Sequence, residues 1–235
     1  MVKDTLLFVL AIVPGLLICW YIYRMDKYEK ESRLQLAITF ALGMAITYPV
    51  LKIEAWATYS GWGGTQNLGA VFFSSFVVVA LTEELAKYLA LLSYPYSRPF
   101  FNEPMDGIVY AVMISMGFAT LENILYAGKF GFQTTLLRAF TAVPAHASFA
   151  IIMGYFIGRS KYAFSVASKR QLIGLGLLVP VTVHGVYDLF ILQEYYEELM
   201  ILALALLGAS IYIATKLIRK HQENSPFKGN EEMNE

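Results

Sequence analysis

Several ionisable side chains lie inside segments that are otherwise apolar enough to cross a membrane. The stretch FVVVALTEELAKYLALL, residues 76–92, places Glu83, Glu84 and Lys87 in the middle of such a segment. A charge at the centre of a bilayer costs about 2.5–3.5 kcal/mol on insertion scales, and such residues mark functional sites by default. A buried glutamate beside a lysine can stay ionised and act as a base. We therefore expect this helix to form one wall of a reactive site.

The next three apolar segments also carry ionisable groups. They are Glu122 in GFATLENILY, His146 in PAHASF, and His184 with Asp188 in HGVYD. At a rise of 1.5 Å per helical residue, Glu83 and these groups lie about 16–24 Å from the expected cytoplasmic ends of their helices. Four helices with ionisable groups at a similar depth predict one shared polar site.

Helical spacing indicates how these side chains pair. Lys87 follows Glu83 by four residues and Glu84 by three, so it can pair with one carboxylate while the other points elsewhere. His184 and Asp188 are four apart, and a carboxylate at that distance can hold a histidine in one tautomer. Phe118 precedes Glu122 by four residues, which predicts an aromatic floor beneath that carboxylate.

Each of these residues also has a purely structural interpretation. Glu83, Glu84 and Lys87 can form an ion pair between helices, which is weak evidence of function. His146 follows Pro144 and can satisfy the backbone carbonyl that a proline frees. His184 and Asp188 can satisfy each other, and we expect Asn123 to make an interhelical hydrogen bond.

Seven segments provide the approximately 20 apolar residues that a bilayer crossing needs. Their expected bounds are 5–23, 34–51, 68–94, 106–127, 136–158, 171–192 and 198–218. We therefore expect an all-α, polytopic membrane bundle of about seven transmembrane helices, with eight as the alternative count. Most Lys and Arg residues outside the spans lie in 24–33, 159–170 and 216–228. Because cytoplasmic loops are enriched in these residues, the N-terminus is expected outside and the C-terminus in the cytoplasm.

Composition supports a membrane protein. The chain of 235 residues is 57% hydrophobic and 15% charged, whereas a soluble domain has about 25% charged residues. Its net charge of zero gives no reason to expect nucleic acid as a partner. The single cysteine, Cys19, cannot build a disulfide framework or a cysteine-based zinc site. We expect one integral membrane domain over 1–220, with its motifs within 70–192, and a disordered cytoplasmic tail over 221–235.

Four motifs together resemble those of the PrsW family. They are EELAK (83–87), FATLE (118–122), the single histidine of PAHASF (His146), and HGVYD (184–188). The family patterns are E-E-x-x-K, F-x-x-x-E, a lone histidine and H-x-x-x-D, in that order. Each motif alone is unspecific, but four in order within spans are specific. The resemblance covers residues 70–192.

The resemblance implies a function. PrsW-like proteins are bacterial intramembrane proteases that make the first cut in a membrane-anchored anti-sigma factor, on its extracytoplasmic side, and the freed sigma factor directs a stress response. It therefore implies a single-span membrane protein as substrate and the bacterial plasma membrane as location. The related CAAX-type prenyl peptidases have E-E-x-x-x-R, F-x-x-x-H and H-x-x-x-N. This chain departs from those patterns at Lys87, Glu122 and Asp188, so that alternative is less favoured.

Peptide hydrolysis in a membrane needs a water, a base and a group that stabilises the oxyanion. We expect Glu83 to activate the water, with Glu84 as its partner or alternate. His184, oriented by Asp188, is expected to orient the water or stabilise the oxyanion. The remaining members of the expected site are Glu122 and His146, with Lys87, Phe118 and Asn123 in support.

A metal remains an open alternative. Its expected ligands are Glu122, His146, His184 and Asp188, which are residue types that zinc accepts. The chain has no H-E-x-x-H helix, which would indicate zinc strongly. The resemblance implies a metalloprotease, whereas the prenyl-peptidase relatives are argued to be glutamate proteases without metal. We expect no essential, tightly bound metal.

Two other classes of membrane protein use similar residues. A proton- or cation-coupled transporter also needs intramembrane acids and histidines. Such transporters commonly have inverted repeats and broken helices, and the sequence shows neither convincingly. A b-type haem protein would use His146 and His184 as axial ligands, and absence of a Soret band in the purified protein would exclude it.

Overall fold

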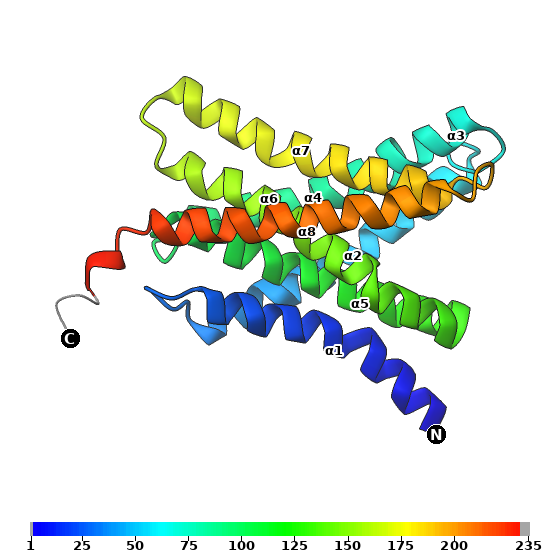
Figure 1. Ribbon diagram of the computed structural model, residues 1–235, viewed down its shortest axis with the longest axis horizontal. Coiled ribbons are helices and arrows are strands. Elements are labelled where there is room, and N and C mark those ends of the chain that lie inside the picture. Colours follow the sequence, from blue (N-terminus) through cyan, green and yellow to red (C-terminus); the bar gives the residue numbers. More distant parts are fainter. Residues whose placement is uncertain (1, 231–235) are drawn as a thin grey trace.

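The computed structural model describes residues 2–230, and its elements are all helical (Figure 1). Within that range the α-helices are α1 (Val2–Met25), α2 (Arg33–Tyr59), α3 (Leu68–Phe73), α4 (Thr82–Ser93), α5 (Pro104–Phe140), α6 (Ala142–Lys161), α7 (Val166–Leu192) and α8 (Leu199–Glu223). A π-helical segment, η1 (Ser74–Leu81), joins α3 to α4, and short 3-10 turns, η2 and η3, lie at Pro95–Ser97 and Lys228–Asn230. The predicted all-α class is confirmed.

Six helical segments of the described chain are long and apolar enough to cross a membrane. They are Thr5–Met25, Arg33–Tyr59, Leu68–Ser97, Pro104–Lys161, Val166–Leu192 and Leu199–Glu223. The sequence-based count of seven divides the 58-residue segment Pro104–Lys161 into two spans. That segment consists of α5 and α6, which meet at Thr141. The count of seven and the orientation stay predictions.

Helices α5 and α6 form the centre of the bundle. In their combined segment, 83% of the most apolar stretch is buried, against 22–39% in the other five segments. Close packing depends on glycines, because a Cβ on Gly107 of α5 would lie 2.3 Å from the carbonyl oxygen of Gly154 on α6. Gly154 and Gly158 are four apart on α6, and small residues at this spacing let membrane helices approach closely. The backbone of α5, which supplies Glu122, thus lies close to that of α6, which supplies His146.

Helix α5 reverses before its end. Gly131 has a φ of 76°, a left-handed value that favours glycine, and breaks the helical backbone. Arg138 follows Asn123 by 15 residues, which in a straight helix would separate them by about 22 Å. Instead, Arg138 Nε donates a hydrogen bond to Asn123 Oδ1 at 2.8 Å. The break therefore brings the last turns of α5 back to its middle.

The segment predicted as one span over 68–94 is not a uniform helix. It contains η1, in which the wider π-helical turns precede the glutamates of α4. Segment η1 packs on α7, since a Cβ on Gly185 would lie 2.5 Å from the ring of Phe76. Short π-helical segments occur frequently at functional sites. In this chain the π-helical segment η1 sets the position of Glu83 and Glu84 relative to α7.

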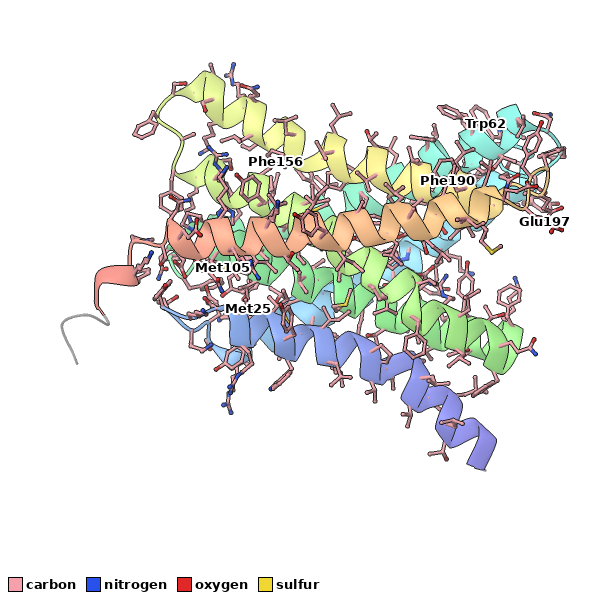
Figure 2. All side chains as sticks on the ribbon, in the orientation of Figure 1. Met25, Trp62, Met105, Phe156, Phe190 and Glu197 are labelled. Atoms are coloured by element: carbon pink, nitrogen blue, oxygen red, sulfur yellow. The ribbon has the colours of Figure 1, made fainter. Side chains whose placement is uncertain are left out.

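The end of the chain packs on the bundle as far as the structure describes it. Helix α8 continues to Glu223, so residues 221–223 of the expected tail are helical. His221 is buried and stacks on Tyr155, and the Ser225 hydroxyl donates a hydrogen bond to Glu103. Residues 231–235 of the expected tail lie outside the described residues. Figure 2 shows Met25 and Met105 near this end of the bundle and Trp62 and Glu197 at the other.

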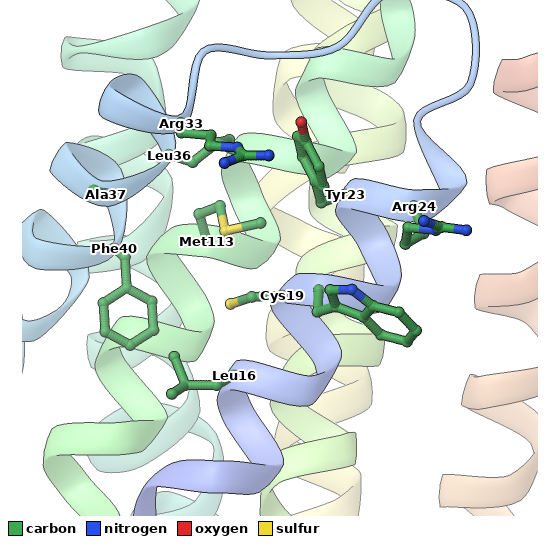
Figure 3. Close-up of a pocket in the computed structure, with 10 residues that line it drawn as sticks. Leu16, Cys19, Tyr23, Arg24, Arg33, Leu36, Ala37, Phe40 and Met113 are labelled. Atoms are coloured by element: carbon green, nitrogen blue, oxygen red, sulfur yellow. The ribbon is translucent and has the colours of Figure 1, made fainter.

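An apolar groove of about 590 Å³ lies between α1 and α2 and contains the thiol of Cys19 (Figure 3). Leu16, Phe40 and Met113 also line it, and Arg24 and Arg33 lie at one end. None of the expected site residues lines this groove. The candidate site therefore lies elsewhere in the bundle.

Candidate active site

The charged residues of α4 are buried and paired with one another. Glu83, Glu84 and Lys87 are each 1–2% exposed. Lys87 Nζ donates to Glu83 Oε2 at 2.9 Å and to Glu84 Oε1 at 2.8 Å. The prediction that Lys87 pairs with only one carboxylate is therefore wrong. The long lysine side chain places its ammonium between positions i−3 and i−4, where both carboxylates reach it.

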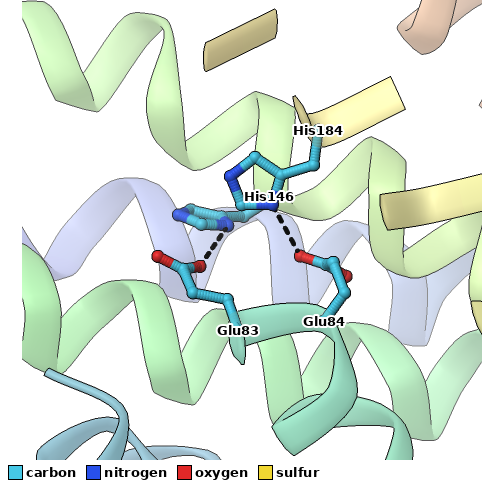
Figure 4. A group of neighbouring side chains, drawn as sticks. All are labelled: Glu83, Glu84, His146 and His184. Carbon is cyan, nitrogen blue, oxygen red and sulfur yellow. Dashed lines mark hydrogen bonds and ion pairs between the residues drawn. The ribbon is translucent and has the colours of Figure 1, made fainter. Parts of the chain in front are cut away.

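His184 of α7 lies between two carboxylates. Its Nδ1 is 3.0 Å from Glu84 Oε1, and its Nε2 is 3.2 Å from Asp188 Oδ2 (Figure 4 shows the contact with Glu84). The ring stacks on Phe149 with centroids 4.9 Å apart. Asp188 thus holds the imidazole from one side, as its i, i+4 spacing predicts, and Glu84 holds it from the other. The orientation of His184 is fixed on three sides.

His146 of α6 also faces the cluster. Its Nδ1 lies 3.1 Å from Lys87 Nζ and 3.8 Å from Glu83 Oε2 (Figure 4), and its Nε2 lies 3.2 Å from Glu122 Oε2. Both ring nitrogens therefore contact site residues rather than a freed backbone carbonyl. The ring of His146 lies at right angles to that of His184, with centroids 5.5 Å apart.

Arg138 holds Glu122 and Asn123 in place. Its guanidinium lies 2.6 Å from Glu122 Oε2 and also bonds Asn123. The interhelical hydrogen bond expected from Asn123 is therefore made across the break at Gly131, between the part of α5 in the predicted span 106–127 and the part in the predicted span 136–158. Sequence reasoning missed Arg138 as a site residue, because only the reversal at Gly131 brings it near Glu122. The one feature of the sequence that pointed to Arg138 was its position near the start of the predicted span 136–158.

Phe118 lies beneath the ammonium rather than beneath a carboxylate. Lys87 Nζ is 4.4 Å from the centre of its ring, a distance at which the π-face attracts a cation. The ring is also 6.0 Å from that of His146. Phe118 is fully buried and therefore helps to keep Lys87 directed at the glutamates.

A cavity of about 300 Å³ opens onto these residues. Its lining includes Glu83, Glu122, His146, His184 and Asp188. A second cavity of about 680 Å³ adjoins it, because four residues line both: Glu54, Val79, Tyr126 and Leu192. The larger cavity thus lies next to the one that the buried cluster lines.

Glu54 of α2 lies where the two cavities meet. Its Oε1 is buried and has no hydrogen-bond partner among the described residues. Sequence reasoning missed Glu54, because the stretch YPVLKIEAWATYSGW reads as an interfacial belt of aromatic residues. Glu54 is the single acid in that stretch, and this isolated position was the feature that could have marked it as a site residue.

The donor groups at the site fit a metal ion. Glu83, Glu84, His146 and His184 each offer one ligand atom, and these four atoms lie within 4.8 Å of one another. Two imidazole nitrogens with carboxylate oxygens are a set that zinc accepts. The sequence-based set had Glu122 and Asp188 in place of the two glutamates. In the structure each of these acids contacts a histidine, as carboxylates behind metal-bound histidines commonly do.

Comparisons with known proteins identify a family to which the chain is similar. Residues 31–215 match the model of a family described as PrsW family intramembrane metalloprotease. Six curated relatives carry the name Protease PrsW, and three of them are described below. The protein of Geobacillus kaustophilus is 35% identical over 83% of this chain and 85% of its own, and that of Clostridioides difficile is 32% identical over 83% of each. The protein of Bacillus subtilis is 36% identical over 76% of this chain and 79% of its own. No solved structure shows a significant match.

The family model covers most of the chain, and the relatives align over most of their own length. The predicted resemblance is therefore confirmed. The chain belongs to the PrsW family of intramembrane proteases.

Proposed function

We propose that this intramembrane protease makes the first cut in a single-span, membrane-anchored anti-sigma factor of a bacterial plasma membrane, and that the cut leads to sigma-factor release and a stress response. The observation that carries the proposal is the buried cluster of Glu83, Glu84, Lys87, His146 and His184. Three of its members, Glu83, His146 and His184, line a cavity. Family membership establishes the peptidase class, and the anti-sigma factor is the finer part of the proposal.

We further propose seven crossings with the N-terminus outside. In that topology the chain between α2 and α3 lies on the extracytoplasmic side. Gly64 and Thr65 of this connection line the 680 Å³ cavity, together with Thr58 and Lys129. A substrate that enters from the extracytoplasmic side would reach Glu83 past Glu54. This route supports cleavage on that side of the membrane.

In the proposed reaction, Glu83 accepts a proton from a water molecule as the water oxygen attacks the scissile carbonyl carbon. Glu83 then gives the proton to the leaving amine nitrogen as the C–N bond breaks. Lys87 forms an ion pair with Glu83 Oε2 at 2.9 Å and so holds this carboxylate in position for the step. His184, held by Glu84 and Asp188, is placed to orient the water or stabilise the oxyanion.

The family description favours a metal at this site, against the sequence-based expectation of no essential metal. Glu84, His146 and His184 would hold it and leave Glu83 as the base, and a divalent ion would supply Lewis-acid polarisation of water and carbonyl there. Lys87 contacts three of these four residues and is the cation that balances them in this structure.

The test is cleavage of the single-span anti-sigma factor from the same organism. We expect a shortened product on co-expression with the wild-type chain, and a strong loss of product with Glu83→Gln, Glu84→Gln or His184→Ala. Unchanged cleavage by all three variants would contradict the proposed site. Ion flux in proteoliposomes that survives Glu83→Gln, without cleavage by the wild type, would favour the transporter alternative.

A further inference from the structure

A second cluster of buried acids lies at the end of the bundle near Met25 and Met105 (Figure 2). Asp26 and Glu31 come from the connection between α1 and α2, and Asp106 comes from the first turn of α5. These three side chains are 0–4% exposed, and Glu29 beside them is half-buried. Asp106 and Glu122 lie about 24 Å apart along α5, so this cluster is separate from the active site.

The acids converge on one point. Glu29, Glu31 and Asp106 each offer a carboxylate oxygen, and the three oxygens lie within 4.8 Å of one another. Ligands on opposite sides of a divalent ion are about 4.0–4.2 Å apart for Mg²⁺ and about 4.6–5.2 Å for Ca²⁺. The spacing is therefore compatible with either ion.

Three carboxylate oxygens of these four acids accept hydrogen bonds: Asp106 Oδ2, Glu31 Oε2 and Asp26 Oδ2, the last from the backbone N–H of Glu31 at 3.4 Å. Asp106 Oδ2 accepts backbone N–H groups of Asn102 at 2.5 Å and Glu103 at 2.8 Å, which caps the start of α5. Glu31 Oε2 accepts the hydroxyl of Tyr110. Four further oxygens are buried and lack a hydrogen-bond partner within residues 2–230; they are Asp106 Oδ1, Glu31 Oε1, Glu29 Oε2 and Asp26 Oδ1. Buried polar atoms without a partner call for an explanation such as a bound ion.

Within residues 2–230, no basic side chain lies close enough to this cluster to form an ion pair with it. The ammonium of Lys30 donates to the backbone carbonyls of Tyr23 and Asp26. That of Lys161 likewise donates to three backbone carbonyls, those of Tyr96, Arg98 and Phe101. Both lysines therefore donate their hydrogen bonds to neutral oxygens and attract Asp26 and Asp106 only from beyond ion-pair distance.

The electrostatic consequence is visible in Asp26 and Glu31. Burial, and next the neighbouring Glu103, raises the pKa of Asp26 to about 7. Burial likewise raises the pKa of Glu31 to about 7. Both carboxylates are thus held in surroundings that disfavour their charge, which a bound cation would reverse.

We propose that Glu29, Glu31 and Asp106 bind a hard divalent cation, Mg²⁺ or Ca²⁺, with Asp26 next to it. All available ligands are oxygens, which these ions prefer, and half-buried Glu29 leaves room for water to complete the coordination. The ion would join the α1–α2 connection to the start of α5. Glu103 extends this junction to the end of α8, through its hydrogen bond with Ser225.

The test counts Mn²⁺, an electron-paramagnetic substitute for both ions, bound to the full chain in detergent. Wild type is compared with Glu29→Gln, Glu31→Gln and the control Glu197→Gln, which removes an exposed charge at the opposite end of the bundle (Figure 2). We expect the first two variants to bind one ion fewer, or to bind it at least tenfold more weakly. Glu197→Gln should match the wild type. If Glu31→Gln does not fold, half-exposed Glu29→Gln decides the question.

Thermal unfolding identifies the ion. After chelation, Mg²⁺ or Ca²⁺ at a hundredfold excess over its dissociation constant should raise the melting temperature of wild type by about 5 °C or more. The increase should be lost in Glu29→Gln and kept in Glu197→Gln. The proposal would be overturned if all four proteins bound Mn²⁺ equally, or if neither Mg²⁺ nor Ca²⁺ raised the melting temperature of wild type. Either result would indicate that these carboxyl groups share protons instead of binding an ion.

Discussion

The two buried charged clusters of this chain balance their charge differently. At the active site, Lys87 and Arg138 form ion pairs with Glu83, Glu84 and Glu122. In the acidic cluster formed by Asp26, Glu29, Glu31 and Asp106, no described basic side chain does so. A buried charge must be paired, neutralised or bound to an ion. The comparison indicates that the first cluster supplies its own cations, whereas the second depends on protons or on an ion from solution.

The largest expected effect is on catalysis. Glu83→Gln keeps the size of the side chain and removes its ability to accept a proton. We expect cleavage to fall by about 10²–10⁴-fold, the usual contribution of a general base. The rate of product formation in detergent measures this, with Glu29→Gln as the charge-matched control from the acidic cluster. Equal loss in both variants would mean that the clusters do not differ in role.

Removal of Lys87 should affect stability more than any change in the acidic cluster. Lys87→Met leaves Glu83 and Glu84 buried without their ammonium. Breaking a buried pair in this way costs about 3–5 kcal/mol. The melting temperature should fall accordingly, while Lys129→Met at the outer cavity should change it little. If Lys87→Met is as stable as wild type, the active-site acids are not balanced by Lys87.

A smaller effect is expected where η1 packs on α7. The Cβ of Gly185→Ala would lie 2.5 Å from the Phe76 ring, so the ring or η1 must move. Overpacking of this kind costs about 1–3 kcal/mol. We expect lower cleavage and a lower melting temperature, both restored in part by adding Phe76→Leu, which frees space. Absence of any rescue would show that contact with Phe76 does not position the glutamates.

The smallest effect has the opposite sign. In the presence of a chelator, Glu29→Gln removes one of several like charges from the acidic cluster. Like-charged neighbours destabilise by a few tenths of a kcal/mol, so the melting temperature should rise slightly, by about 1 °C. Thermal unfolding with and without chelator measures this. A lower melting temperature of Glu29→Gln than of wild type, both measured with chelator, would show that Glu29 already has a stabilising partner. The contrast with Lys87 would then disappear.

Much of the active site was predictable because its residues lie at regular helical spacings within apolar segments. The depth of Glu122, His146 and His184 in three successive spans was enough to place them near Glu83. Arg138 was not predictable in this way, because its position depends on the reversal at Gly131. Glu54 was hidden in a stretch whose aromatic residues suggest an interface, and only packing brings it to the cavity.

The acidic cluster was not predictable for a different reason. Asp26, Glu29 and Glu31 lie in a charged connection that reads as solvated, and Asp106 is some 75 residues further along the chain. Only the packing of α1 and α2 against α5 buries these carboxylates together. Fold class and family thus follow from local patterns, whereas burial of loop residues needs the tertiary structure.

The most direct measurement of the central claim is cleavage in proteoliposomes that contain only this chain and a single-span anti-sigma factor from the same organism. Wild type should yield one shortened product, cut on the extracytoplasmic side, and Glu83→Gln should yield at least a hundredfold less. The product should be absent from liposomes without the chain. An intact substrate with wild type, or the same product with Glu83→Gln, would contradict the assignment of Glu83, His146 and His184 to a proteolytic site.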